Sequence, residues 1–140
     1  MYEALALRLG VEDVGRLYGH VRHGDISPSG QARAGEVVRP VLGGVFPGPW
    51  VSIMVMPVAQ GQQIAAHTDQ MAPQVARYHI PLLLNPGCWV FHGTGWQQLE
   101  EGQCYRMDPR VLHGAVNWGT TPRYHLIIDY EGVPQCPNGK

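Results

Sequence analysis

The chain has 140 residues, of which 44% are hydrophobic and 15% are charged, with a formal net charge of −1; this suits a single domain over residues 1–140 with one core. The low charge and the scattered arginines argue against nucleic-acid binding, which needs clustered cations to neutralise phosphates. The sequence has no apolar run long enough to span a bilayer and no signal-peptide pattern at its start, so we expect a cytoplasmic protein without a membrane partner.

The first nineteen residues form the best helical stretch, with apolar residues at Leu5, Leu7, Leu9, Val11, Val14 and Leu17 and acidic residues at Glu12 and Asp13. We predict one or two short helices there, packed outside a sheet. Residues 20–49 are rich in Gly and Pro, which indicates an irregular connection or a lid with a short strand around Glu36–Leu42.

From residue 50 onward, short β-branched and aromatic runs alternate with turn signals, and helical patterns are absent. The predicted strands are Trp50–Val58, Val75–Leu84, Cys88–His92, Gln103–Met107, Val111–Asn117 and Arg123–Tyr130, with a loop containing Gly93, Gly95 and Trp96 after the third. Short strands at this spacing are typical of an antiparallel sandwich or jelly roll. We therefore predict a mainly all-β fold whose core occupies about residues 50–131.

Histidine makes up seven of the residues, and two His-x-Asp motifs are candidates for a metal site. In an extended segment both side chains of this motif project to one side and can chelate one cation. His23-Gly24-Asp25 lies in the Gly/Pro-rich connection, and we interpret it as a solvated turn. His67-Thr68-Asp69 leads from one predicted strand toward the next, so His67 and Asp69 are the better candidate ligands.

A distal histidine and an arginine complete the pattern. His113 lies on a predicted strand, and Arg123 begins the last strand ten residues later. Two histidines and one carboxylate on one face of an octahedral ferrous ion leave positions for a bidentate 2-oxoacid and dioxygen. The far carboxylate of a dicarboxylic cosubstrate then needs a cation, which an arginine beside the distal ligand supplies. The spacing thus predicts a site for a metal and a dicarboxylate.

The full pattern extends over roughly residues 51–130. It consists of Gly61-x-x-Ile64-x-x-His67-x-Asp69, then Arg77-Tyr78-His79-Ile80-Pro81-Leu82, then Met107-Asp108, His113, Asn117, Arg123, Leu126 and Asp129. In this order and spacing it resembles the aspartyl/asparaginyl β-hydroxylase family of Fe(II)/2-oxoglutarate oxygenases. The resemblance implies a double-stranded β-helix, or jelly-roll, fold.

The resemblance also implies a role for each matching residue. His67, Asp69 and His113 would bind the iron at the catalytic centre. Arg123 would bind the distal carboxylate of 2-oxoglutarate, His79 would contact the cosubstrate, and Arg77 would contact the substrate. A serine that would help bind the cosubstrate is missing upstream, where Met56 lies instead.

The implied cofactors are Fe(II), 2-oxoglutarate as cosubstrate and O2, with succinate and CO2 as coproducts. Because carboxylates are the natural partners of an arginine in a partly dry pocket, we expect the substrate to be a carboxylate-bearing amino acid or peptide side chain. Two alternatives remain: a catalytically silent jelly roll that binds a metal or a carboxylate, and a cupin-type metalloenzyme that does not use 2-oxoglutarate. Cupins favour a His-x-His cluster, which the sequence lacks, and have no need for Arg123.

Overall fold

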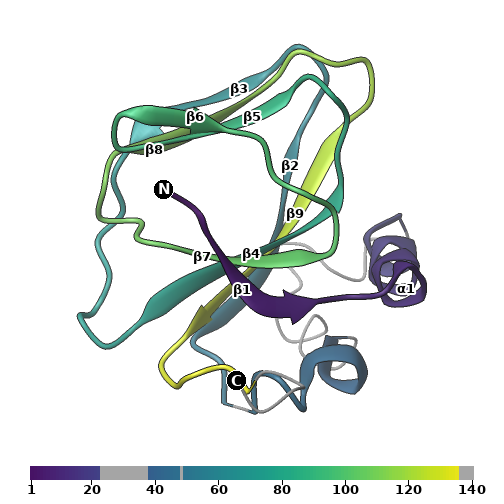
Figure 1. The fold of residues 1–140 in the computed structure, drawn as a ribbon, viewed down its shortest axis with the longest axis vertical. Helices are drawn as coiled ribbons and strands as arrows, with labels where there is room; N and C mark the ends of the chain where they lie inside the picture. Colours follow the sequence, from purple (N-terminus) through teal and green to yellow (C-terminus); the bar gives the residue numbers. More distant parts are fainter. Residues whose placement is uncertain (23–37, 48, 136–140) are drawn as a thin grey trace.

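The computed structural model describes residues 1–22, 38–47 and 49–135, which contain two antiparallel sheets (Figure 1). The larger sheet has the strand order β1-β7-β4-β9-β2, formed by β1 (Glu3–Arg8), β7 (Gln103–Met107), β4 (Ala76–Leu83), β9 (Arg123–Tyr130) and β2 (Ser52–Val58). The smaller sheet has the order β3-β8-β5-β6, formed by β3 (Gln63–His67), β8 (His113–Asn117), β5 (Cys88–His92) and β6 (Gly95–Gln97). Two facing antiparallel sheets confirm the predicted jelly roll.

Helical segments lie beside the larger sheet, on the side away from the smaller one (Figure 1). They are α1 (Val11–Arg22) and a helical turn at residues 38–42. The main hydrophobic core lies between these segments and the sheet, and it contains Leu17, Val38, Leu42 and Phe46 packed with Tyr78, Ile80, Leu126 and Ile128. No helix among the described residues is long and apolar enough to cross a membrane.

Alternation of side chains along the central strands decides what faces the space between the two sheets. On β2, β4 and β9, one set of alternate residues packs into the main core, including Ile53, Val55, Tyr78, Ile80, Leu126 and Ile128. The other set lines an interior pocket and includes Met54, Met56, Arg77, His79, Arg123 and Ile127. The period of two therefore gives each strand one apolar face for the core and one face for a functional site.

The helical prediction for the first nineteen residues is wrong in its first half. Residues Glu3–Arg8 form β1, and only the segment from Val11 onward is helical. Leu7 is buried on one side of β1 while Arg8 is exposed, which is the alternation of a strand. β1 pairs with β7, so that Ala4 lies opposite Tyr105. This distant pairing overrides the local helix propensity of Ala and Leu.

Two further predictions differ from the structure. A strand was predicted around Glu36–Leu42, but residues 38–42 are helical, while residues 36 and 37 lie outside the described residues. Val38 and Leu42 are both fully buried, as positions four apart on one face of a helix can be. The loop predicted after His92 also contains the short edge strand β6, which pairs Phe91 with Trp96.

Candidate metal centre and its pocket

Two neighbouring strands of the smaller sheet bring His67, Asp69 and His113 together. His67 ends β3 and His113 begins β8, and the two residues are register partners in this antiparallel pair. Asp69 lies in the irregular segment that follows β3, and its backbone N–H donates to the Pro109 carbonyl at 2.8 Å. Among the described residues, these three side chains form one group that could hold a metal ion. They are the same three residues that the sequence predicts as ligands.

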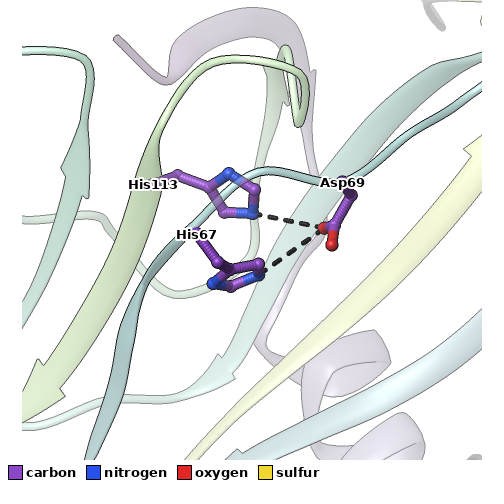
Figure 2. A group of neighbouring side chains, drawn as sticks. All are labelled: His67, Asp69 and His113. Atoms are coloured by element: carbon purple, nitrogen blue, oxygen red, sulfur yellow. Dashed lines mark ion pairs between the residues drawn. The ribbon is translucent and has the colours of Figure 1, made fainter.

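The potential ligand atoms of the three side chains face one another (Figure 2). Asp69 Oδ2 lies 3.6 Å from His67 Nε2 and 3.4 Å from His113 Nε2. All three ligand atoms lie within 4.8 Å of one another. Two imidazoles and one carboxylate converging in this way are the donor set of non-haem iron sites.

Backbone hydrogen bonds prepare both imidazoles for a metal. His67 Nδ1 lies 2.8 Å from the Ala65 carbonyl oxygen, and His113 Nδ1 lies 2.8 Å from that of Val111. A carbonyl oxygen can only accept, so each Nδ1 carries the proton and each Nε2 keeps its lone pair for a metal. The pKa of His113 is also lowered, and burial is the largest cause. The lowered pKa favours the neutral ring that a metal requires.

Gly114 allows β3 and β8 to approach closely beside His113. A Cβ at this position would lie 2.7 Å from the Ile64 carbonyl oxygen, which belongs to the backbone and cannot move aside cheaply. We expect Gly114→Ala to lower the free energy of unfolding by about 1–3 kcal/mol, because the added methyl group forces the strands apart. Gly95→Ala is the matched control, since a Cβ there meets nothing within 4 Å. Urea unfolding of both variants tests this, and equal effects would contradict it.

The triad lies at one side of an interior pocket of about 160 Å³. Besides the triad, its polar lining comes from the larger sheet and from the N-terminus: Arg77, His79, Arg123 and Tyr2. The apolar lining comprises Met54, Met56, Ile64, Ala115 and Ile127. The structure thus places all six predicted site residues around one cavity.

Arg123 is a buried cation without an ionic partner among the described residues. It is 2% exposed, and its Nε is a buried donor without a hydrogen-bond partner. Burial lowers its pKa to about 10, although Tyr2 and Cys88 act in the opposite direction. The guanidinium therefore remains charged near neutral pH. A buried unpaired charge is costly, so this pocket is suited to an anion.

His79 and His125 form a buried pair beside Arg123. Their Nδ1 atoms lie 3.0 Å apart, so one must donate and the other accept. His125 Nε2 is buried without a partner. Because a buried orphan N–H is rarer than an unpaired acceptor, the arrangement favours His125 as the donor. His79 then carries its own proton on Nε2 and offers a donor to the pocket.

Both histidines are neutral in the folded protein and should make its stability depend on pH. Burial, followed by the charge of Arg123, lowers the pKa of each well below 6.5. The unfolded chain takes up these protons below pH 6.5 whereas the folded protein does not, so stability is complete above that pH and falls below it. For two groups, we expect the loss to approach about 3 kcal/mol per pH unit. Urea unfolding of metal-free protein from about pH 7.5 to about pH 5.5 tests this; a constant free energy would contradict it.

Tyr2 is a pocket residue that the sequence reasoning missed. Its ring packs edge-on against His79 at a centroid distance of 5.1 Å. Gln97 holds its backbone on both sides, accepting from the Tyr2 N–H and donating to the Tyr2 carbonyl, each at 3.0 Å. Burial raises the pKa of Tyr2 to about 12, so the phenol stays protonated. Tyr2 directly precedes β1, and the alternation of small and large side chains in residues 3–8 was the signal that could have revealed this strand.

Arg77 lies between two carboxylates. It donates from Nη1 to Asp69 Oδ2 at 2.8 Å and forms two hydrogen bonds with Asp129, from Nε at 2.8 Å and from Nη2 at 3.0 Å. The contact with substrate that the resemblance implies for Arg77 stays a prediction. Asn117, another residue of the family pattern, is fully buried and donates to the carbonyls of Val58 and Thr121, which is a structural role. The rejected motif His23-Gly24-Asp25 lies outside the described residues.

Comparison with known proteins shows what the chain resembles. A family model described as aspartyl/asparaginyl beta-hydroxylase matches residues 40–132. A structure described as the nickel complex of ThoJ, a non-heme monooxygenase, has a TM-score of 0.58 at 14% identity, covering 91% of this chain and 72% of that chain. ThoJ without ligand has a TM-score of 0.56 at 13% identity over the same shares. A Cupin_2 domain of an XRE family transcriptional regulator from Enterobacter cloacae has a TM-score of 0.48 at 16% identity, covering 61% and 90%. No curated protein sequence matches.

Fold and site together define a double-stranded β-helix protein with a candidate His/Asp/His metal site, the class to which many non-haem oxygenases belong. The matched region includes β2 to β9 and all six site residues. The chain belongs to the aspartyl/asparaginyl β-hydroxylase family. This membership makes it an enzyme of the oxygenase type.

Proposed function

We propose that the chain is an Fe(II)/2-oxoglutarate-dependent dioxygenase that hydroxylates a carboxylate-bearing amino acid or peptide side chain. The observation that carries this proposal is Arg123, a buried guanidinium without an ionic partner that lines the same pocket as the metal triad. A metal site alone would gain nothing from a cation in its pocket. A dicarboxylate, in contrast, can chelate the metal at one end and pair with Arg123 at the other.

The residues present fit a ferrous ion. His67 and His113 each offer an Nε2 lone pair, because their Nδ1 protons are engaged by backbone carbonyls, and Asp69 offers a carboxylate oxygen. When bound, Fe(II) would supply the activation of O2 that couples decarboxylation of 2-oxoglutarate, giving succinate and CO2, to insertion of the second oxygen atom into a substrate C–H bond. The chain itself supplies orientation and a dry pocket.

Other pocket residues support the binding of 2-oxoglutarate. Arg123 can form a bidentate pair with the far carboxylate, and His79 can donate to it from Nε2. The neutral phenol of Tyr2 adds a second uncharged donor-acceptor group beside them. Met56 occupies the place where a serine was expected and lines the pocket with an apolar surface, so the donors come from other elements of the fold.

The substrate would approach from the exposed side of the triad. The side chains of His67 and Asp69 are 41% and 35% exposed, whereas that of His113 is only 9% exposed. Arg77 lies at this side of the triad, because it is hydrogen bonded to Asp69. Three of its five N–H groups donate to Asp69 and Asp129. The remaining two are available to a substrate carboxylate, which supports the proposed substrate class.

Coupled turnover tests the proposed function. The purified protein with Fe(II), 2-oxoglutarate and O2 is incubated with a panel of free amino acids and short peptides, each paired with its amidated analogue. We expect a carboxylate-bearing member to stimulate succinate release in proportion to a hydroxylated product. Product formation that does not need 2-oxoglutarate would favour the cupin-type alternative. Stimulation only by analogues without a carboxylate would contradict the substrate class.

A further inference from the structure

The contacts of Arg77 form a continuous chain that ends at the metal triad. Ser52, Asp129 and Arg77 occupy register positions on the adjacent strands β2, β9 and β4, with Asp129 paired to both of the others. Ser52 Oγ donates to Asp129 Oδ2 at 3.1 Å, and Asp129 receives the two hydrogen bonds from Arg77. The Nη1 of Arg77 then reaches Asp69 Oδ2 at 2.8 Å.

This series of contacts is more buried than an ordinary surface ion pair. The side chains of Arg77 and Asp129 are 15% and 9% exposed, whereas those of the Arg8–Glu100 pair are 54% and 68% exposed. A two-bond pair between a guanidinium and a carboxylate fixes both groups in one plane. Arg77 is therefore held rigidly by Asp129, with its remaining Nη1 directed to the carboxylate of Asp69.

Charge balance explains why an arginine can stand beside a cation site. An unpaired guanidinium next to Asp69 would compete with a metal ion for the carboxylate and would repel the metal ion. Asp129 supplies one negative charge for the one positive charge of Arg77. The pair is neutral as a whole, so it can orient Asp69 by a hydrogen bond without cancelling the charge that Asp69 offers to a metal.

From these contacts we propose that Arg77, held and neutralised by Asp129, is a positioning residue that orients the metal ligand Asp69. The inference rests on the metal site of the proposed function and adds a role beyond the contact with substrate. Partners that orient metal ligands from behind change metal affinity by about 10- to 100-fold when they are replaced. The assignment therefore predicts an effect on metal binding in the absence of both cosubstrate and substrate.

Anaerobic titration of the metal-free protein with Co(II), followed by visible absorption and by calorimetry, tests the assignment. We expect Arg77→Lys, which keeps the charge but loses the planar fork, to weaken Co(II) binding by about 10- to 100-fold and to alter the cobalt spectrum. Asp129→Asn should weaken binding as well, because it leaves the charge of Arg77 uncompensated beside Asp69. Arg8→Lys and Glu100→Gln, made in the exposed pair, are the matched controls and should leave Co(II) binding unchanged.

A double-mutant cycle identifies the route of the effect. If Asp129 acts through Arg77, the double variant should lose much less affinity than the product of the two single losses. Ser52→Ala is the mild variant, and we expect it to weaken Co(II) binding a few-fold. If circular dichroism shows that the other variants fold poorly, the Co(II) affinity of Ser52→Ala tests the positioning role of Arg77. Unchanged Co(II) affinity and spectrum in the folded variants, with only the KM for substrate raised, would overturn the assignment.

The outcome is separable from that of the proposed function. A wild-type protein that binds Co(II), whose Arg77 and Asp129 variants bind it weakly, but that releases no succinate would contradict the proposed function and leave the role of Arg77 intact. A wild-type protein that does not bind Co(II) at all would overturn both.

Discussion

The His113→Ala variant should lose metal binding and all turnover. The triad has three protein ligands and the described residues offer no replacement for the distal one, so its removal takes away most of the affinity. Anaerobic calorimetric titration with Fe(II) measures the binding, and succinate release measures the turnover. Circular dichroism of the variant separates loss of the ligand from loss of the fold.

Two substitutions in the other His-x-Asp motif are the controls for this result. His23→Ala and Asp25→Ala should leave both Fe(II) binding and turnover unchanged, because His67 and Asp69 are the residues that meet His113. Loss of Fe(II) binding in His23→Ala, with binding retained in His113→Ala, would show that the metal site had been assigned to the wrong motif.

The Arg123→Gln variant should lose affinity for 2-oxoglutarate while keeping its metal. Removing one partner of a buried ion pair typically costs about 2–5 kcal/mol, which corresponds to a loss well over tenfold. His67 and His113 lie on β3 and β8, Asp69 follows β3, and none of the three is hydrogen bonded to Arg123 among the described residues, so Fe(II) or Mn(II) affinity should be nearly unchanged. Calorimetric titration of the Mn(II)-loaded protein with 2-oxoglutarate measures the effect without turnover.

Arg106→Gln is a suitable comparison for Arg123→Gln. Arg106 lies on β7, is exposed, and does not line the pocket of the triad. Its replacement should not change the affinity for 2-oxoglutarate. An Arg123→Gln variant with the same affinity as the Arg106→Gln variant would remove the cosubstrate role from Arg123 and would favour a metal site that works without 2-oxoglutarate.

The strands and the triad could be predicted because their signals are local or depend only on spacing. The runs Cys88–His92, Gln103–Met107 and Arg123–Tyr130 begin and end in the structure at the predicted residues. His67-x-Asp69 needs only an extended segment to point both side chains one way. His113 and Arg123 were identified by their order along the chain; they lie in different sheets, and the two facing sheets place both at the same pocket.

The remaining features depend on contacts between distant parts of the chain. Tyr2 reaches the pocket because β1 pairs with β7, and nothing in the local sequence gives that partner. Arg77 and Asp129 meet because β4 and β9 pair in one particular register. Side-chain alternation assigns each residue to a face, but a shift of one residue would separate the pair. The helical turn at residues 38–42 was missed because its β-branched residues favour a strand until packing selects the helix.

Anaerobic titration of the Fe(II)-loaded protein with 2-oxoglutarate, followed by visible absorption, tests the proposed function most directly. Bidentate chelation of the iron by a 2-oxoacid should produce a weak charge-transfer band that saturates with added 2-oxoglutarate. The band should need far more 2-oxoglutarate in the Arg123→Gln variant, and it should be absent from the His113→Ala variant. A protein that binds Fe(II) tightly but shows no such band at any concentration of 2-oxoglutarate would contradict the assignment.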